Sequence, residues 1–128
     1  MARRLLWAAA ALLAAGLALA LAPGGAELPE GITVGASYSG GSALISYEDA
    51  GASTERVVLE VLGMRESFRR ELAGPSFEVG IPFDGEPEFG WAAHPVVLEI
   101  YRPGHDTLFV KTEIRPAGEE PAPVIVTP

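Results

Sequence analysis

The stretch Pro95–Arg115 constrains the fold of this chain most, because it contains two alternating runs separated by turn residues. A period of two is typical of strands that are buried on one face. The apolar faces comprise Val96, Leu98 and Ile100 in the first run and Leu108, Val110, Thr112 and Ile114 in the second. Between them, Arg102–Asp106 contains a proline and a glycine, which predicts a turn in a hairpin loop. An isolated hairpin is at best marginally stable in water, so the rest of the chain should supply a covering sheet.

Five further segments predict strands ahead of this hairpin. They are Ile32–Tyr38, Ala43–Tyr47, Arg56–Leu62, Met64–Leu72 and Ser76–Ile81. Met64–Leu72 fits both helical and strand spacing, and a short edge strand is favoured because its neighbours are strands. About seven short strands at regular spacing predict an all-β fold, an antiparallel two-sheet sandwich.

The N-terminus has the three-part pattern of an export signal. Met1–Arg4 is basic, Leu5–Ala22 holds eighteen residues without charge or proline, and Pro23–Ala26 ends on a small residue. We therefore expect a signal helix over residues 1–26, with cleavage before Glu27. The alternative is an uncleaved anchor, since the apolar run approaches the roughly 20 residues that span a bilayer. Both interpretations place the rest of the chain outside the cytoplasm, in the periplasm, the cell envelope or the medium, with no other membrane contact expected.

Composition excludes several classes of function. Residues 27–128 carry seven Lys and Arg against seventeen Asp and Glu, a net charge of −10, which repels nucleic acid. The absence of cysteine excludes disulfides, zinc–thiolate sites and thiol nucleophiles. The segment is long enough for one domain, which we expect over residues 27–116. Residues 117–128 predict a proline-rich acidic tail; Val124–Pro128 could add to a sheet edge, but terminal disorder is the default expectation.

Strand number and spacing over residues 30–116 resemble the immunoglobulin or fibronectin type III class of bacterial exported domains. The chain departs from that class in lacking its Cys and Trp framework, and either Tyr47 or Tyr101 could form its tyrosine-corner hydrogen bond. The resemblance implies a binding or spacing role by analogy, because this architecture carries many unrelated functions.

The loop Phe83–His94 is the longest irregular stretch within the predicted domain. Asp84, Glu86 and Glu88 could converge on a calcium ion, although an unliganded acidic loop is favoured because Pro87 restricts how they turn. Phe89 and Trp91 are candidate partner contacts, since loop aromatics often anchor interfaces, or else a plug over the end of the sandwich.

Arg102 is the third candidate contact. Arg102-Pro103 resembles the first two residues of the Arg-Pro-aromatic element in chagasin-type protease inhibitors, which are also seven-stranded immunoglobulin-like domains. The resemblance implies a secreted inhibitor as an alternative function, but Gly104 replaces the aromatic residue, and a plain turn is the default expectation.

No constellation in the sequence predicts a reaction. A hydrolytic triad needs a positioned serine, and no Gly-x-Ser-x-Gly elbow is present. His94 and His105 are too few for a transition-metal site without cysteine. We therefore expect a non-enzymatic binding or structural module, an accessory part of an envelope or cell-surface assembly, with an unidentified protein partner and no cofactor.

Overall fold

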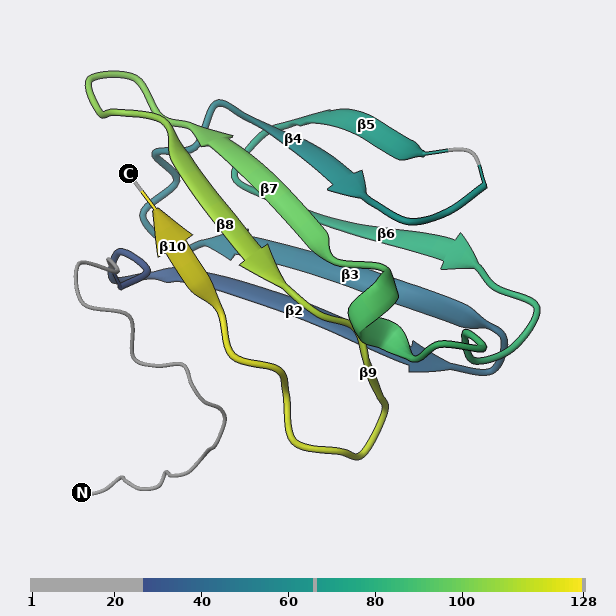
Figure 1. Cartoon of the computed structure of the whole chain (residues 1–128). Helices are drawn as coiled ribbons and strands as arrows, with labels where there is room; N and C mark the ends of the chain where they lie inside the picture. Colours follow the sequence, from purple (N-terminus) through teal and green to yellow (C-terminus); the bar gives the residue numbers. More distant parts are fainter. Residues whose placement is uncertain (1–26, 66, 128) are drawn as a thin grey trace.

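The computed structural model describes residues 27–65 and 67–127. Two β-sheets pack face to face over these residues, as Figure 1 shows. The predicted signal helix, residues 1–26, lies outside the described part of the chain. Within that part, no helix has the length and apolar character needed to cross a membrane.

The larger sheet has five strands in the order β10-β8-β7-β4-β5. They are β10 (Ile125–Thr127), β8 (Leu108–Thr112), β7 (Val96–Tyr101), β4 (Arg56–Val61) and β5 (Phe68–Ala73). All neighbours in this sheet are antiparallel. The hairpin expected from the alternating runs is confirmed, because β7 pairs with β8 from Val96 opposite Thr112 to Ile100 opposite Leu108.

The smaller sheet has four strands in the order β6-β3-β2-β9. They are β6 (Ser76–Pro82), β3 (Ser42–Asp49), β2 (Ile32–Ser39) and β9 (Arg115–Pro116). β2 and β9 run parallel, and the other pairs are antiparallel. The chain changes sheet five times, between β3 and β4, β5 and β6, β6 and β7, β8 and β9, and β9 and β10, so the two layers share one core.

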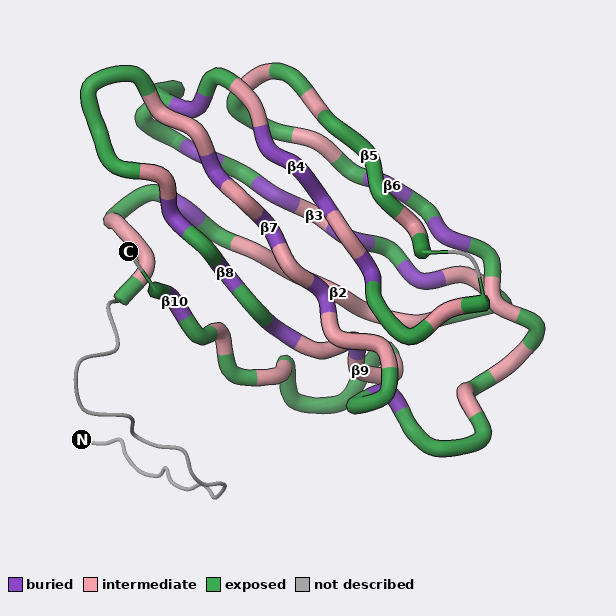
Figure 2. The backbone as a smooth tube through the Cα atoms, turned by 45° about the horizontal axis from the view of Figure 1, so that its top comes forward, coloured by how far each residue is buried: buried purple, intermediate pink, exposed green. Residues whose placement is uncertain are grey.

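Alternation of buried and exposed residues along each strand builds that core, as the banding in Figure 2 shows. Residues that are completely or almost completely buried come from both sheets. They include Ile45, Tyr47, Val57, Leu59, Val61, Ile81, Val96, Leu98, Ile100, Val110, Ile114 and Val126. Each is an apolar or aromatic residue at an inward position of its strand or at the crossing between sheets. The all-β two-sheet prediction is therefore confirmed.

The last predicted run, Leu108–Arg115, is wrong as one strand. β8 ends at Thr112, and Arg115 and Pro116 lie in the other sheet as β9, where they pair with Ser37 and Tyr38 of β2. Ile114 is fully buried at the crossing between the sheets. Because Ile114 is apolar and points inward, it continues the alternating pattern of β8 although the chain is already crossing to the other sheet. The sequence pattern therefore predicted a strand longer than β8.

Two uncertain segments are settled by the strand pairings. Phe68–Ala73 forms β5 at the edge of the larger sheet, which confirms the edge strand preferred for this part of Met64–Leu72. The expectation of disorder at the C-terminus is wrong for Ile125–Thr127. These residues form β10 and pair with Phe109–Lys111 of β8, because Val126 is apolar at the one position that faces the core.

The loop between β6 and β7 divides the two aromatic candidates. Trp91 opens the short 3-10 helix η2 (Trp91–Ala93) and is 9% exposed, and its ring centre lies 5.0 Å from those of Tyr38 and Phe83. Phe89, two residues earlier, is 83% exposed. The plug interpretation is therefore confirmed for Trp91 and wrong for Phe89, since only one of the two side chains covers the end of the sandwich.

Candidate functional site

The outer face of the five-stranded sheet is the side turned away from the core. Its composition follows from the register, since every second residue of each strand points outward. The outward residues are Ile125 and Thr127 of β10, Phe109 and Lys111 of β8, Val97, Glu99 and Tyr101 of β7, Arg56, Val58 and Glu60 of β4, and Arg69, Glu71 and Ala73 of β5. Apolar, aromatic and charged side chains therefore share one surface.

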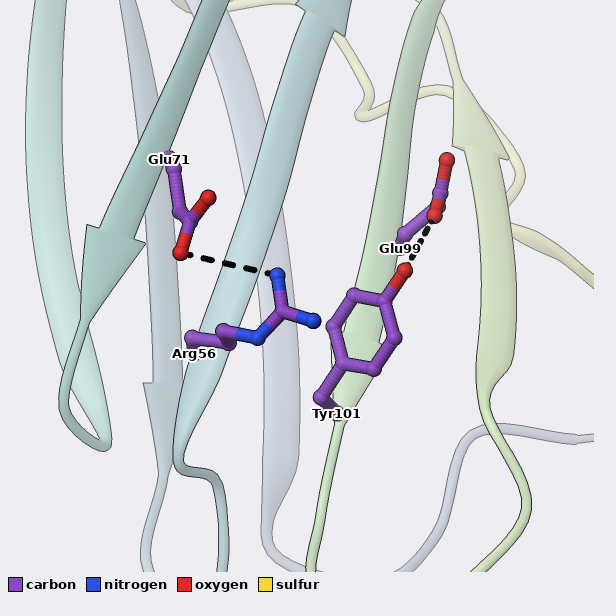
Figure 3. Close-up of polar contacts among 4 residues, drawn as sticks. All are labelled: Arg56, Glu71, Glu99 and Tyr101. Atoms are coloured by element: carbon purple, nitrogen blue, oxygen red, sulfur yellow. Dashed lines mark hydrogen bonds and ion pairs between the residues drawn. The ribbon is translucent and has the colours of Figure 1, made fainter.

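Four of these residues form a connected polar cluster, which Figure 3 shows: Arg56, Glu71, Glu99 and Tyr101. The guanidinium carbon of Arg56 lies 3.8 Å from the centre of the Tyr101 ring. A nitrogen of the same group lies 3.5 Å from a carboxylate oxygen of Glu71. The Tyr101 hydroxyl donates a hydrogen bond of 2.6 Å to the Glu99 carboxylate. These contacts link the side chains across β5, β4 and β7.

The hydrogen bond from Tyr101 to Glu99 raises the pKa of the Tyr101 hydroxyl above its ordinary value, and partial desolvation adds to the rise. The phenol therefore stays protonated and holds its donor position at neutral pH. Arg56 covers one face of the ring at the same time, by a cation–π contact. The Tyr101 ring is consequently held in one orientation by Arg56 and Glu99.

Val58 lies on the same outer face as the cluster. It points outward between Glu99 of β7 and Glu71 of β5, yet it is only 5% exposed. Long charged side chains can bury apolar surface beneath their stems while their charged ends stay in water. Val58, at the centre of the outer face, is therefore shielded from water although it points away from the core.

Next to the cluster lies an exposed apolar pair, Phe109 and Ile125, which are 42% and 49% exposed. Phe109 stands opposite Glu99 on β7 and opposite Thr127 on β10, while Ile125 stands opposite Lys111. Ile125 is thus diagonal to Phe109 across the β8–β10 pair, and such neighbours lie about 7–8 Å apart. The apolar pair and the polar cluster form one continuous surface.

The opposite outer face, on the four-stranded sheet, is different. It carries an open, shallow hollow of about 540 Å³ lined by Thr33, Ser46, Tyr47, Glu48, Ser76, Phe77 and Glu78. Its single large exposed apolar residue among those described is Leu44, at 42%. Leu44 therefore matches Phe109 in exposure while lying on the other side of the molecule.

The three predicted partner contacts do not lie together. The loop that carries Phe89 and Trp91 precedes β7, and Arg102 follows it, so the strand separates them and they lie at opposite ends of the sandwich (Figure 1). Arg102 lies in a turn in which its carbonyl accepts a hydrogen bond of 3.0 Å from His105 N–H. Trp91 and Arg102 therefore do not contribute to one common edge of the sandwich.

The acidic residues of the same loop are separate as well. Asp84, Glu86 and Glu88 are all exposed. Within residues 27–65 and 67–127, no three His, Cys, Asp or Glu side chains approach closely enough to hold a metal ion together. The calcium alternative therefore has no preformed ligand set in the described chain.

A buried carboxylate that was not predicted from the sequence is Asp49, which is 5% exposed at the end of β3. One of its oxygens accepts hydrogen bonds from the Ser53 and Thr54 backbone and hydroxyl groups at 2.7–3.0 Å, and the other accepts one from Gly51 N–H at 3.0 Å. Because Thr54 donates its hydroxyl proton to Asp49, Tyr47 must donate in the 2.6 Å contact between its hydroxyl and Thr54. The Asp49 cage, residues 49–54 with Tyr47, therefore closes the loop before β4.

The two tyrosines considered for a tyrosine corner are both occupied elsewhere. Tyr47 donates to the Thr54 hydroxyl, and Tyr101 donates to the Glu99 carboxylate. Both acceptors are side chains, whereas the corner of the immunoglobulin class uses a backbone acceptor. The hydrogen bonds of these hydroxyls therefore serve the Asp49 cage and the outer face instead.

The hydrogen bonds from Thr54, the largest contribution, and from Ser53 and Gly51 lower the pKa of Asp49 to about 2, from an ordinary value of 3.8. A pKa lower in the folded state means that the ionised form stabilises folding above pH 4 and that this gain is lost as the pH falls through about 2. The shift corresponds to roughly 2 kcal/mol.

We expect the difference in unfolding free energy between the natural chain and Asp49→Asn to shrink by about 2 kcal/mol between pH 6 and pH 2. Urea unfolding of both chains at a series of pH values measures it. A difference that stays constant over this range would show that the Asp49 charge does not stabilise the fold.

The two-sheet all-β architecture is compatible with the immunoglobulin-like class to which the strand spacing pointed. Comparison of the chain with models of protein families, with curated proteins and with solved structures finds no match.

Proposed function

We propose that this chain is a non-enzymatic, extracytoplasmic β-sandwich module that binds a protein partner through the outer face of its five-stranded sheet. In this role it serves as an accessory component of an envelope or cell-surface assembly. The immunoglobulin or fibronectin type III class of exported bacterial domains is the corresponding family-level proposal, and it rests on strand number, spacing and the two-sheet architecture.

The observation that carries the proposal is the position of the exposed apolar pair beside the preorganised polar cluster. Single exposed apolar residues are ordinary on protein surfaces, whereas adjacent ones mark interaction sites more often. Tyr, Arg and Phe are enriched at the centres of interfaces. Here Tyr101, Arg56 and Phe109 lie on three neighbouring strands of one sheet.

Preorganisation supports the same conclusion. Ordering flexible side chains on binding costs about 0.5–1.5 kcal/mol each. Arg56 and Tyr101 are already held by Glu71 and Glu99, so a partner would meet side chains whose rotamers are largely set. The cluster pairs two acids with one base and an aromatic ring, which favours a partner surface of mixed charge with an apolar centre.

The extracytoplasmic location rests on the N-terminal sequence. The basic start, the uncharged run Leu5–Ala22 and the small residues after it follow the export pattern. The loop residue Phe89, which is 83% exposed, is a separate candidate contact at one end of the sandwich. Arg102 and the buried Trp91 are weaker candidates for direct contact because their side chains are less exposed.

Capture from envelope extract with Phe109→Ser and Leu44→Ser tests the proposal. The two residues are equally exposed, each at 42%, on opposite outer faces. We expect Phe109→Ser to reduce partner capture at least roughly tenfold, since truncating a hot-spot residue of an interface costs about 2 kcal/mol or more. Leu44→Ser should capture as much as the natural chain. Equal capture by both variants would refute this binding surface.

A further inference from the structure

The C-terminal strand β10 is held by few contacts. It has three residues at the edge of the larger sheet, and Val126 is its single buried side chain, at 1% exposure. Two side-chain hydrogen bonds add to the strand pairing: Thr112 donates to the Pro123 carbonyl at 3.1 Å, and Thr127 donates to the Phe109 carbonyl at 3.4 Å. The rest of the core can therefore persist while β10 detaches.

The segment that connects β9 to β10 is long enough for a detached β10 to move away from the sheet. Residues 117–121 are all exposed and run outside the sandwich, as Figures 1 and 2 show. Prolines at 116, 121 and 123 favour extended backbone and disfavour collapse onto the sheet. The eight residues from 117 to 124 can span about 26 Å when extended. A detached β10 can consequently meet another molecule before it returns.

When β10 detaches, β8 becomes the edge strand of the larger sheet, and the structure shows what a replacement strand must contact. β8 would expose the backbone groups of Phe109–Lys111 and the apolar space that Val126 fills. The segment that fits this edge is Ile125–Thr127 itself, and residues 121–127 carry no charge. The same segment of a second copy would make the same contacts without burying any of the acidic residues.

We propose that β10 exchanges between two copies of the chain, each copy placing its Ile125–Thr127 strand on the β8 edge of the other. Reciprocal exchange produces a closed dimer with two-fold symmetry, because the donated and accepted surfaces are identical. This inference does not depend on the proposed partner. Within one chain the tether keeps β10 at a high effective concentration, so the exchanged dimer increases with protein concentration.

Charge sets the salt dependence of the exchange. The full chain has a formal net charge of −8, and Glu119 and Glu120 lie in the connection that must approach the second copy. Like charges repel over a Debye length of about 10 Å at 0.1 M salt and less at higher salt. Exchange is therefore faster at high ionic strength than at low.

Disulfide trapping between separately purified variants tests the exchange. The natural chain has no cysteine, and Ile125 stands directly opposite Lys111 in the β10–β8 register. Both side chains are exposed, so Lys111→Cys and Ile125→Cys leave the core intact. The two full-length variants, one with an affinity tag, are mixed with oxidised glutathione and analysed on non-reducing gels. Opposed strand residues lie within the Cα distance that a disulfide requires.

Leu44→Cys mixed with Ile125→Cys is the matched control for random collisions, because Leu44, like Lys111, is exposed, but on the opposite outer face. We expect the 111–125 heterodimer to form at least roughly tenfold faster than the 44–125 heterodimer, since exchange holds the first pair of thiols in register. The double variant Lys111→Cys with Ile125→Cys in one chain, oxidised at low protein concentration, should lock as a monomer that no longer exchanges. Equal rates for the two mixtures would overturn the exchange.

Discussion

Replacing Gly63 with alanine is expected to lower the free energy of unfolding by roughly 2–4 kcal/mol. Gly63 has a φ of +81°, and a Cβ added there would overlap the carbonyl oxygen of Ala93. The Ala93 carbonyl cannot easily move away, because two hydrogen bonds hold the segment after Ala93 against Leu62. Leu62 N–H donates to the Pro95 carbonyl at 3.0 Å, and His94 Nδ1 lies 3.1 Å from the Leu62 carbonyl. A carbonyl only accepts, so the proton of this hydrogen bond is on Nδ1.

Gly104→Ala is the matched control, because Gly104 has the same φ of +81° and a Cβ there would have no atom within 4 Å. It should lose only the cost of the left-handed backbone, about 1–2 kcal/mol. Urea unfolding of the three chains measures the difference. Equal losses at the two glycines would show that the backbone around Ala93 yields, and that the loop after β4 does not hold η2 in place.

Replacing Asp49 with alanine should have an effect of similar or larger size, on the order of 3–5 kcal/mol. The substitution leaves three backbone N–H groups and two hydroxyls of residues 51–54 without their acceptor. The loss also reaches the core, since Tyr47 is 1% exposed and its hydroxyl is held by Thr54. Thermal and urea unfolding measure the loss.

Asp84→Ala supplies the control for Asp49. It removes the same charge from an exposed loop position, so it should change the unfolding free energy by less than about 0.5 kcal/mol. Asp49→Asn should lower the unfolding free energy by an amount between those of Asp49→Ala and Asp84→Ala. The amide keeps one acceptor oxygen, but its NH2 group would face N–H and O–H donors and could not bond to them. A loss at Asp49→Ala no larger than at Asp84→Ala would contradict the structural role of the cage.

The strands could be predicted from the sequence because burial on one face imposes a period of two. Val96–Tyr101 and Leu108–Thr112 show that pattern with little interruption, and both form strands. β9 and β10 could not be predicted in the same way. A two-residue strand carries no period, and in β10 a single inward residue, Val126, follows a proline-rich segment that indicates disorder when considered alone.

The sequence also could not predict that Trp91 would be buried and Phe89 exposed. Both are aromatic and flank one glycine, and either could have covered the end of the sandwich. The space beside Tyr38 and Phe83 holds one indole, and the turn in which Gly90 N–H donates to the Pro87 carbonyl leaves Phe89 outside. Volume and turn geometry decided the outcome, and neither is visible in residue spacing.

Which side chains become neighbours on the outer face depends on the register of the strands, and the register cannot be predicted from the alternation of residues. Arg56 and Tyr101 are 45 positions apart in the sequence, and they meet because β4 pairs with β7 at that register. Phe109 and Ile125 become neighbours only once β10 is placed on β8. The Asp49 cage did have a local signal: an aspartate followed by serine and threonine in a short loop is typical of side-chain-capped turns.

Photocrosslinking in intact cells tests binding through the outer face most directly. A benzophenone side chain at position 109 reports contacts of the five-stranded sheet, and the same group at position 44 reports contacts of the opposite face at equal native exposure. The proposal predicts a discrete crosslinked protein from position 109 and no such product from position 44. A discrete product from position 44 with none from position 109 would contradict it.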